Sequence, residues 1–569
     1  MPSLLHKMGT LKTRHGGKKG NEMPKELKRA KNILCGGFAE GDGEMRVVNP
    51  ATGELLGVAP SEFSSERWSP ENIGEIARAA QEFWHWEVEE QEKEAVFAAM
   101  AQNFKAHRGP LARTMVLEGG KLGRWADAEV QEVLDTITHY HGEVSRYHTN
   151  DGFARCQLPD KNAFSLLMPY GNILTVKPWN FPAAVPMWAI CGALAGGNSV
   201  LVKPAEQTPF TMQYVAELVL KSFTDALPPA KVGRLAGLVQ VVNGTGPGTG
   251  KPLLEKYAYD KVTFTGSDAV GRIIARTAGE RLKPCHLELG GHAAMVVLDD
   301  FDIDLAVREA LNAVFGDSGQ RCVSTRVVYV QESAYKEFLS KFVAGAKTRR
   351  VGNPMDPATD MGPLISLDQR EIVNKMVLDT ASQLGRKPLV GGYALNYASR
   401  SFAKNDGLNV DDAVFEGGGA YFAPTIFTEV PYGTTAMDQE IFGPVVVVNP
   451  LAGRTREEAF WNAVALVNKS QYGLSNALLT NDRRISSRAP GRIHTGIFYI
   501  GRGTTGAELN KYFGGVKSSG WGREGRGLGD WTQIQQVYDD FHGKARMAQA
   551  GADDTVRALL AASRSVFEK

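Results

Sequence analysis

A cysteine in a small, polar stretch is the first residue of the sequence that could do covalent chemistry. Cys322 follows residues 316–321 (GDSGQR) and precedes the β-branched run Val323–Val330. This pattern predicts a loop-to-strand or loop-to-helix junction, where a thiol can face a cleft and act as a nucleophile. Taken alone, a lone cysteine is more often a small buried apolar residue.

An acid and an amide could assist such a nucleophile. Glu288 stands between Leu287 and Leu289 and is followed by two glycines. Apolar neighbours desolvate a carboxylate and raise its pKa toward that of a general base. Asn180 lies in the segment 177–182 (KPWNFP), whose prolines would hold its amide as a donor to an oxyanion. In isolation, a hydrogen-bonded acid and a proline-rich turn explain these two segments better.

Two other segments suit a dinucleotide. A strand that ends at Lys203, before Pro204, would place Lys203 and Glu206 where ligands bind in open α/β sheets. A carboxylate there can bind ribose hydroxyls. Residues 264–267 (FTGS) lead a strand through Gly266 and Ser267 into a helix, whose N-terminus favours pyrophosphate. A solvated charge pair and an ordinary capped helix are the alternatives.

The glycine-rich segment 244–251 (GTGPGTGK) resembles a phosphate loop without fitting one. The Walker spacing needs Gly at 245 and Ser or Thr at 252, where the sequence has Thr245 and Pro252. The pattern G-x-G-x-x-G, started at Gly244, fails at Thr249. We interpret the segment as a turn that leaves a strand near the cofactor.

The spacing of apolar residues predicts the elements that must position these side chains. Residues 74–150 are predicted to be helical, with apolar positions three and four apart. From about residue 164, short apolar runs alternate with helical stretches; the predicted strands are 164–168, 173–176, 199–202, 238–242, 261–264, 293–298 and 326–330. This alternation predicts an α/β protein with mostly parallel sheets, one before Glu288 and one after it. Residues 391–421 are predicted to form a long surface loop.

Composition excludes several classes of protein. The 64 basic and 63 acidic residues nearly cancel, so no bulk field favours nucleic acid or a membrane surface. No apolar run approaches the roughly 18 residues that a membrane span needs. Five widely spaced cysteines, without C-x-x-C, indicate neither a disulfide framework nor a metal site, and favour a reducing compartment. The basic residues 1–31 indicate a solvated extension, with a mitochondrial transit peptide as the alternative.

Taken together in order, the motifs resemble the aldehyde dehydrogenase superfamily. The resemblance covers about residues 35–540 and rests on PWNFP (178–182), KPAE (203–206), FTGS (264–267), ELGG (288–291), GQRC (319–322), EIFGP (440–444) and FGGVK (513–517). It implies a Rossmann-like NAD-binding domain at 35–287, with an oligomerisation arm at 150–168, and a catalytic domain at 288–495. Residues 496–540 would return to the first domain, between a basic extension at 1–34 and a helical tail at 541–569.

The resemblance also implies roles for single residues. Cys322 would be the nucleophile, Asn180 would form an oxyanion hole with the backbone N–H of Cys322, and Glu288 would activate the water that cleaves a thioester. The residues implied in NAD binding are Lys203, Glu206, Gly266, Ser267, Glu440, Phe442 and Trp179. Glu206 favours NAD because a carboxylate beside the ribose repels a 2′-phosphate, and Glu288 favours hydrolysis over transfer to coenzyme A.

The substrate and the partners are predicted more coarsely. Residues 502–508 (RGTTGAE) resemble a segment of amino-acid semialdehyde dehydrogenases, so Gly506, Ala507 and Ser324 could hold a substrate carboxylate. Phe181 and Trp188 favour an aliphatic or aromatic aldehyde instead. A non-catalytic binding protein and a cysteine hydrolase are the remaining alternatives. We expect a homodimer or homotetramer, in the cytoplasm or the mitochondrial matrix, without nucleic acid, membrane or metal.

The sequence departs from the family pattern at three positions. His292 stands where many relatives have lysine, Asp317 where many have asparagine, and Lys177 where an apolar residue is common. None of these changes removes a predicted catalytic group. They bear on the polarity of the pocket and therefore on the choice of substrate.

Overall fold

Two parallel-dominated sheets organise the computed structural model, which describes residues 28–63, 68–145, 154–155, 161–523, 525, 527–541 and 557. The first sheet has the strand order β21-β12-β11-β8-β9-β10-β2-β3. Its strands are β21 (Gly520–Trp521), β12 (Cys285–Glu288), β11 (Lys261–Thr265), β8 (Asn172–Val176), β9 (Ser199–Lys203), β10 (Val239–Val241), β2 (Asn32–Leu34) and β3 (Gly37–Ala39). The five strands from β12 to β10 are parallel, which confirms the predicted fold class.

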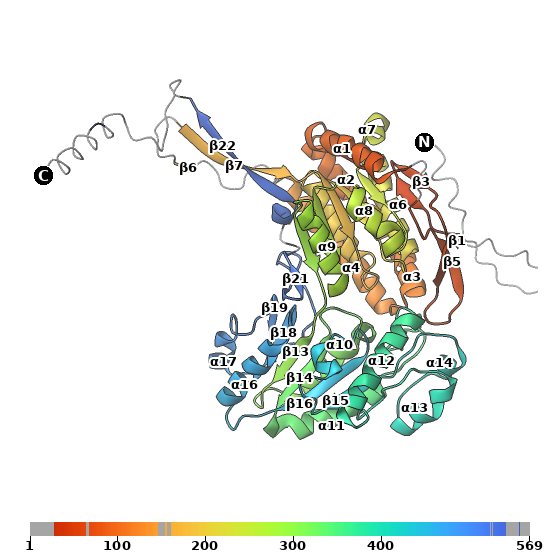
Figure 1. Ribbon diagram of the computed structural model, residues 1–569, viewed down its shortest axis with the longest axis vertical. Helices are drawn as coiled ribbons and strands as arrows, with labels where there is room; N and C mark the ends of the chain where they lie inside the picture. The colour runs from red at the N-terminus through yellow and green to blue at the C-terminus, as the bar shows by residue number, and fades with distance from the viewer. Residues whose placement is uncertain are drawn as a thin grey trace, which may run out of the picture.

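The second sheet has six parallel strands in the order β15-β16-β14-β13-β18-β19. They are β15 (Thr425–Thr428), β16 (Val445–Leu451), β14 (Thr325–Gln331), β13 (Ala293–Val297), β18 (Ser475–Leu479) and β19 (Ile497–Ile500). All residues of β13, β14 and β18 are buried, as expected for parallel strands covered on both faces. Figure 1 shows the two sheets one above the other, joined near the middle of the molecule.

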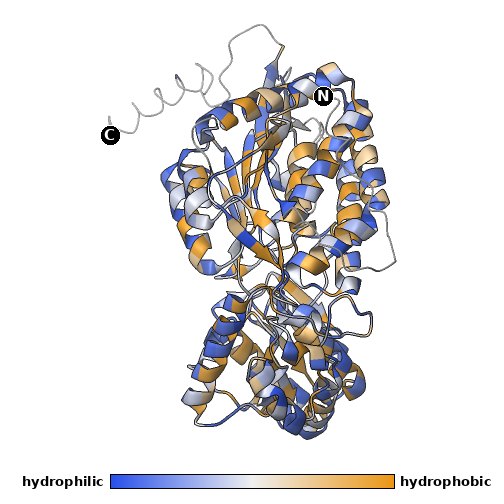
Figure 2. Ribbon diagram, turned by 90° about the vertical axis from the view of Figure 1, so that its right-hand side faces the viewer, coloured by the Kyte–Doolittle hydropathy of each residue, from blue (hydrophilic) through white to orange (hydrophobic). Residues whose placement is uncertain are grey.

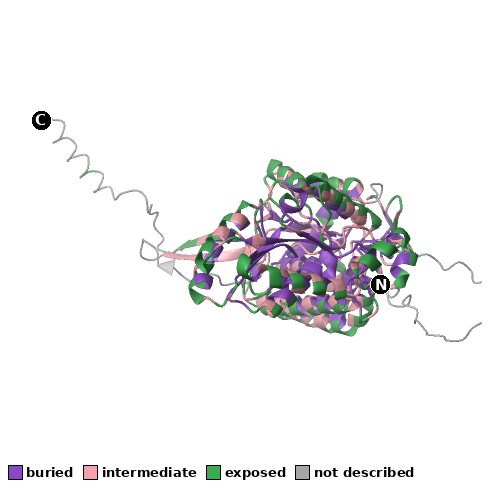
Figure 3. Ribbon diagram, turned by 90° about the horizontal axis from the view of Figure 1, so that it is seen from below, coloured by how far each residue is buried: buried purple, intermediate pink, exposed green. Residues whose placement is uncertain are grey.

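Helices cover both sheets. Around the first lie α1 (Pro70–Trp86), α2 (Glu90–Ala106), α3 (Arg108–Gly119), α4 (Gly123–Val144), α5 (Ala184–Ala195), α6 (Pro209–Ala226), α7 (Pro229–Arg234), α8 (Lys251–Lys256) and α9 (Asp268–Glu280). Around the second lie α10 (Ile303–Phe315), α11 (Glu332–Thr348), α12 (Leu367–Leu384), α13 (Arg400–Asp406), α14 (Asp412–Glu416), α15 (Thr435–Asp438), α16 (Arg456–Lys469) and α17 (Arg483–Arg488). Figure 2 shows apolar strands inside the polar outer faces of these helices, and Figure 3 shows the same strands buried.

Local sequence explains how individual helices begin. Ser69 caps α1 by accepting a hydrogen bond from Asn72 N, and Pro70 occupies the first helical turn. Ser267 caps α9 in the same way, through Val270 N. α5 has no polar face because all its residues except Trp188 are buried, between α4 and the first sheet.

Smaller sheets complete the molecule. β1 (Lys28–Arg29), β5 (Leu55–Ala59) and β4 (Met45–Val48) form one, and β17 (Tyr472–Gly473) pairs with β20 (Val516–Lys517). β22 (Thr532–Asp540), β7 (Lys161–Pro169) and β6 (Ala154–Arg155) form an arm that projects from the first unit in Figure 1. Among the described residues, no helix is both long and apolar enough to span a lipid bilayer.

Three predicted boundaries need correction. The basic extension cannot reach residue 34, because β1 pairs with β5 and β2 joins the first sheet. The second sheet runs to Ile500 rather than ending at 495, because β19 pairs with β18. The segment 391–421 holds α13 and α14 rather than a plain loop, and Asn396 with Ser399 forms a capping box before α13. The predictions for residues 1–27 and for the tail after Phe541, apart from Arg557, lie outside the described residues.

Candidate active site

A cavity of about 700 Å³ lies where the two sheets face each other. From the carboxyl ends of β8, β11 and β12 come Trp179, Asn180, Gly266, Ser267 and Glu288. From the segments before the amino ends of β14 and β16 come Cys322, Glu440 and Phe442. The cavity therefore joins the carboxyl edge of one parallel sheet to the amino edge of the other. Asn180, Glu288 and Cys322, which are distant in the sequence, line this one cavity.

A left-handed turn brings Cys322 to the cavity. Asp317, Ser318 and Gly319 have φ values of 54°, 55° and 71°. A Cβ at Gly319 would lie 2.1 Å from the carbonyl oxygen of Gly443, so only glycine allows this approach. Two consecutive non-glycine residues at positive φ store strain of the kind found at functional sites. The turn therefore packs residues 316–322 closely against the EIFGP segment, residues 440–444.

The surroundings of Cys322 oppose its ionisation. Burial, and then the charges of Glu440 and Glu288, raise the pKa of the Cys322 thiol to about 12. Its backbone hydrogen bond and the guanidinium of Arg326 act in the opposite direction. Without a bound molecule, this sulfur is therefore a thiol at neutral pH. It needs a base or a bound cation to become a thiolate.

Asn180 is held by contacts from both units. Its Nδ2 donates a 2.9 Å hydrogen bond to the Gln320 carbonyl, two residues before Cys322. Its own carbonyl accepts a 2.7 Å hydrogen bond from Lys121 Nζ. Glu129 Oε2 accepts from the same amine at 2.5 Å, and Glu129 Oε1 accepts from Ala183 N at 2.9 Å. An amide has two N–H donors, so one remains to stabilise an oxyanion beside Cys322.

The residues predicted to bind the dinucleotide lie in two groups, one in the cavity lining and one beyond it. Ser267 caps α9, and the Gly266 N–H donates to the Glu288 carbonyl at 3.0 Å. Lys203 and Glu206 lie beyond the cavity lining, with Lys203 Nζ 3.8 Å from Glu206 Oε1. That oxygen also accepts a 2.6 Å hydrogen bond from Gly246 N. Burial lowers the pKa of Lys203 to about 8, and Glu206 opposes the shift.

Glu440 and Phe442 border the opposite side. Burial raises the pKa of Glu440 to about 7, and the nearby Arg326 guanidinium limits the rise. Arg326 Nη2 lies 3.5 Å from Glu440 Oε1 and also donates to the Arg321 carbonyl at 3.2 Å. Trp179 packs edge-on against Phe442, with ring centroids 5.5 Å apart. A carboxylate beside two aromatic rings suits a ribose and a flat heterocycle.

The predicted substrate residues are only partly brought together. Phe181, Trp188, Gly506 and Ala507 line the cavity. Ser324 is buried and outside the lining, and its Oγ has no hydrogen-bond partner among the described residues. His292, which departs from the family pattern, is also buried outside the lining, with Nε2 donating to the Ala436 carbonyl at 3.0 Å.

The sequence reading missed a charged part of the cavity wall. Glu129 and Glu132, three apart on α4, line the cavity together with Trp125 and Arg321. Arg321 lies over the Trp125 ring, 4.2 Å from its centroid. The sequence held a signal for this wall: Glu129 and Glu132 lie three apart on the helix face that also carries the buried Ala126, Val130 and Val133. Acids on a buried helix face are rare and indicate a function. Among the described residues, no three His, Cys, Asp or Glu side chains are grouped to hold a metal ion.

Comparison with known proteins agrees with this geometry. A family model described as "Aldehyde dehydrogenase family" matches residues 38–537. The mitochondrial succinate-semialdehyde dehydrogenase of Oryza sativa subsp. japonica is 31% identical over 90% of this chain and 89% of its own. Aldehyde dehydrogenase [NAD(P)+] 2 of Saccharomyces cerevisiae is 30% identical over 88% and 93%. The solved betaine aldehyde dehydrogenase of Staphylococcus aureus, in complex with NAD+, has a TM-score of 0.80 at 27% identity over 93% and 97%.

These matches define the class of protein. The chain belongs to the aldehyde dehydrogenase family, and its relatives are oxidoreductases that act on aldehydes with NAD(P). Residues from each motif that predicted the resemblance, except KPAE, line the cavity between the two sheets.

Proposed function

We propose that this protein oxidises an aldehyde to a carboxylic acid through a thioester on Cys322. The observation that carries the proposal is the meeting of Cys322, Asn180 and Glu288 in one cavity. The Cys322 thiol loses its proton to solvent, and the sulfur attacks the aldehyde carbon; the Asn180 amide with the Cys322 N–H stabilises the oxyanion. Loss of a hydride from that carbon gives the thioester. Water activated by Glu288 then breaks the carbon–sulfur bond and releases the acid.

The residues present fit a dinucleotide. The cap of the 13-residue helix α9 offers backbone N–H groups to a pyrophosphate. Lys203 and Glu206 stand at the carboxyl end of β9 for the adenosine ribose, and Glu440 and Phe442 stand beside Cys322 for the nicotinamide half. Bound NAD supplies the acceptor for the hydride.

Glu206 favours NAD over NADP because its charge opposes a 2′-phosphate. We expect Glu206→Ser to raise kcat/KM with NADP relative to NAD by about tenfold, roughly 1.4 kcal/mol. Steady-state kinetics with both cofactors measures this ratio. Glu255→Ser, an exposed change on α8, should leave it within twofold.

Substitution of Cys322 tests the proposed chemistry most directly. NADH formation with a panel of aldehydes should be abolished by Cys322→Ser, because an alcohol is a far weaker nucleophile here. Cys191→Ser, at a buried cysteine away from the cavity, should keep the activity if the protein folds. Full dehydrogenase activity in Cys322→Ser would refute the mechanism.

For the substrate, we propose an aldehyde that bears a carboxylate. Gly506 and Ala507 border the cavity, and the rice relative is a succinate-semialdehyde dehydrogenase. Arg321, beside Cys322, adds a positive charge to the wall. Comparing kcat/KM for succinate semialdehyde with that for propionaldehyde, which lacks the carboxylate, tests the anchor. Equal values would discard it.

A second substrate class is favoured by Glu132. Burial, and then the charge of Glu129, raise the pKa of the Glu132 carboxyl to about 7, while Lys121 and Arg321 limit the rise. A carboxylate among Trp125, Trp188 and Phe181 suits the cationic end of an aminoaldehyde or of betaine aldehyde. Glu132 loses its charge as the pH falls through about 7, so KM for a cationic aldehyde should rise on acidification. Glu132→Gln should remove that rise; an unchanged profile would exclude this role.

A further inference from the structure

Glu288 has a buried histidine as its neighbour on the same strand. Residues two apart on β12 point to the same face of the sheet. His286 Nε2 lies 2.9 Å from Glu288 Oε1, and each side chain is 4% exposed. An ionised carboxylate only accepts hydrogen bonds, so the imidazole nitrogen carries the hydrogen in this contact.

Two glycines late in the chain make room for this pair. β21 pairs antiparallel with β12, opposite Leu287 and Glu288. A Cβ at Gly514 would lie 2.7 Å from Glu288 Oε1, and a Cβ at Gly522 would lie 3.2 Å from His286 Cδ2. The FGGVK motif and the strand after it thus enclose both side chains against β12.

We infer that His286 is a positioning residue for Glu288 in the hydrolytic half of the reaction. This inference rests on the proposed function. The N–H donor fixes Oε1 and so orients the carboxylate. A hydrogen bond from a fixed donor also favours the charged form of the carboxylate, the form that accepts a proton from water. A general base uses one oxygen at a time, so Glu288 can keep this bond while it accepts a proton.

The proton balance of the step is closed without another reactant. The water oxygen bonds to the thioester carbon while its proton moves to Glu288. The carbon–sulfur bond breaks, the carboxylic acid leaves, and the proton on Glu288 passes to the Cys322 sulfur, which restores the thiol. His286 keeps its own proton throughout and acts only through Glu288.

Polar and charged groups from three other segments border the pair. On β11, Thr263 and Thr265 are the register partners of His286 and Glu288. Arg523 follows β21, and its Cγ lies 3.0 Å from the Cβ position of Gly514. Cys322 and Glu440 face Glu288 from the second unit, across the cavity. His286 is therefore the hydrogen-bond donor to Glu288 that the strand itself provides.

With p-nitrophenyl acetate as the substrate, acylation of Cys322 and hydrolysis of the thioester can be measured separately and without NAD. Acylation of Cys322 releases p-nitrophenolate in a burst, and the later steady rate reports hydrolysis of the acetyl thioester. We compare His286→Leu, which lacks the donor, with His286→Gln, whose amide keeps an N–H. Thr263→Val is the matched control, because Thr263 is the register partner of His286 in the sheet and its hydroxyl hydrogen-bonds with that of Thr175.

In His286→Leu the steady rate should fall on the order of tenfold, part of the 10²–10⁴-fold that a general base contributes. The burst rate should stay within about twofold, and mass spectrometry should show acetyl-Cys322 accumulating. The acid limb of the steady rate should move to higher pH, because the charged form of Glu288 loses the hydrogen bond that His286 donates. His286→Gln and Thr263→Val should remain near the native rate and profile.

A parallel fall of burst and steady rate in His286→Leu would overturn the inference, as would an unchanged steady rate. If His286→Leu does not fold, His286→Gln decides through its pH profile and thioester lifetime: a lifetime prolonged as much as by Glu288→Gln would refute positioning by an N–H donor. Failure of the proposed function looks different, because the native protein itself would then form no acetyl adduct on Cys322.

Discussion

Cys322, the proposed nucleophile, lies in a place that disfavours its thiolate form. Burial comes first among the causes, and the carboxylates of Glu440 and Glu288 add to it. A high resting pKa protects the thiol from adventitious alkylation and oxidation, which both require the thiolate. Reactivity then depends on groups that arrive with the bound molecules or change their own charge.

The charge of Glu440 can be tested on the thiol directly. Glu440→Gln removes a negative neighbour and should lower the pKa of Cys322, so more thiolate is present at a given pH. Inactivation by iodoacetamide between pH 7 and 9 should be several-fold faster than in the native protein. Asp438→Asn, an exposed change two residues earlier, should not alter it. Slower alkylation of Glu440→Gln would contradict the assigned sign.

Asn180 is the other residue for which the contacts support a proposed role. Asn180→Ala removes the amide that bonds Gln320 and the donor to the oxyanion. We expect kcat to fall about 10²–10³-fold, the usual loss for one oxyanion donor. NADH formation gives kcat, and fluorescence titration with NAD should show a Kd within about threefold of native. A loss confined to KM would speak against transition-state stabilisation.

At the scale of elements, the arm of β22, β7 and β6 projects from the first unit (Figure 1). Ile534 and Tyr538 on β22 are 58% and 66% exposed. Large apolar side chains on a projecting sheet indicate an interface. We propose that the arm pairs with a second copy of the chain in a homodimer or homotetramer.

Ile534→Glu places a charge in that surface and should shift the particle toward a monomer, because a buried unpaired carboxylate opposes association. Light scattering after size-exclusion chromatography measures the mass. Leu389→Glu changes an equally exposed apolar residue of the second unit, at 53%, and should leave the mass unchanged. A native chain that already runs as a monomer would remove the basis of this expectation.

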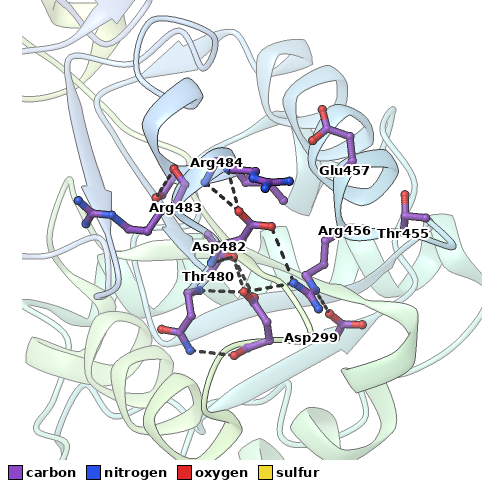
Figure 4. Close-up of polar contacts among 12 residues, drawn as sticks. Asp299, Thr455, Arg456, Glu457, Thr480, Asp482, Arg483 and Arg484 are labelled. Carbon is purple, nitrogen blue, oxygen red and sulfur yellow. Dashed lines mark hydrogen bonds and ion pairs between the residues drawn. The ribbon is translucent and has the colours of Figure 1, made fainter.

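At the scale of the whole molecule, the two edges of the second sheet have different tasks. The amino edge borders the cavity, and the carboxyl edge carries a polar cluster around Asp299, Arg456, Thr480 and Asp482 (Figure 4). Asp300 belongs to this edge: it accepts from Thr480 Oγ1 at 2.8 Å and from Asn481 N at 3.0 Å. These contacts fix the ends of β13 and β18, away from the chemistry.

Asp300→Ala should therefore lower the free energy of unfolding and spare the activity. Two donors lose a mostly buried acceptor, which costs about 1–3 kcal/mol. Asp304→Ala, at a side chain 75% exposed, should cost less than about 0.5 kcal/mol. Urea denaturation and steady-state kinetics on both variants measure the two effects. A drop in kcat for Asp300→Ala without loss of stability would contradict this expectation and would show that the carboxyl edge affects catalysis.

The sequence predicted the parallel strands β8, β9, β10, β11, β13 and β14, because buried strands such as Ser199–Lys203 are apolar runs of the right length. It left the parallel strands β12, β15, β16, β18 and β19 without a prediction. It could not predict β2 or β21, since strands of two or three residues have no readable period. It also missed Lys121 and Glu129, whose importance comes from the Asn180 carbonyl and Ala183 N–H that they meet only after folding.

The cavity takes Asn180 and Glu288 from one α/β unit and Cys322 and Glu440 from the other. The chain crosses between the units at Leu289–His292, directly after Glu288, the proposed general base. In the proposed reaction, the distance across which sulfur, amide and carboxylate cooperate therefore depends on how this connection, together with the return segment from Gly501 to Gly520, holds the two units. Substitutions in these two segments would change the rate through the placement of the units, and neither unit alone would hold all the reacting groups.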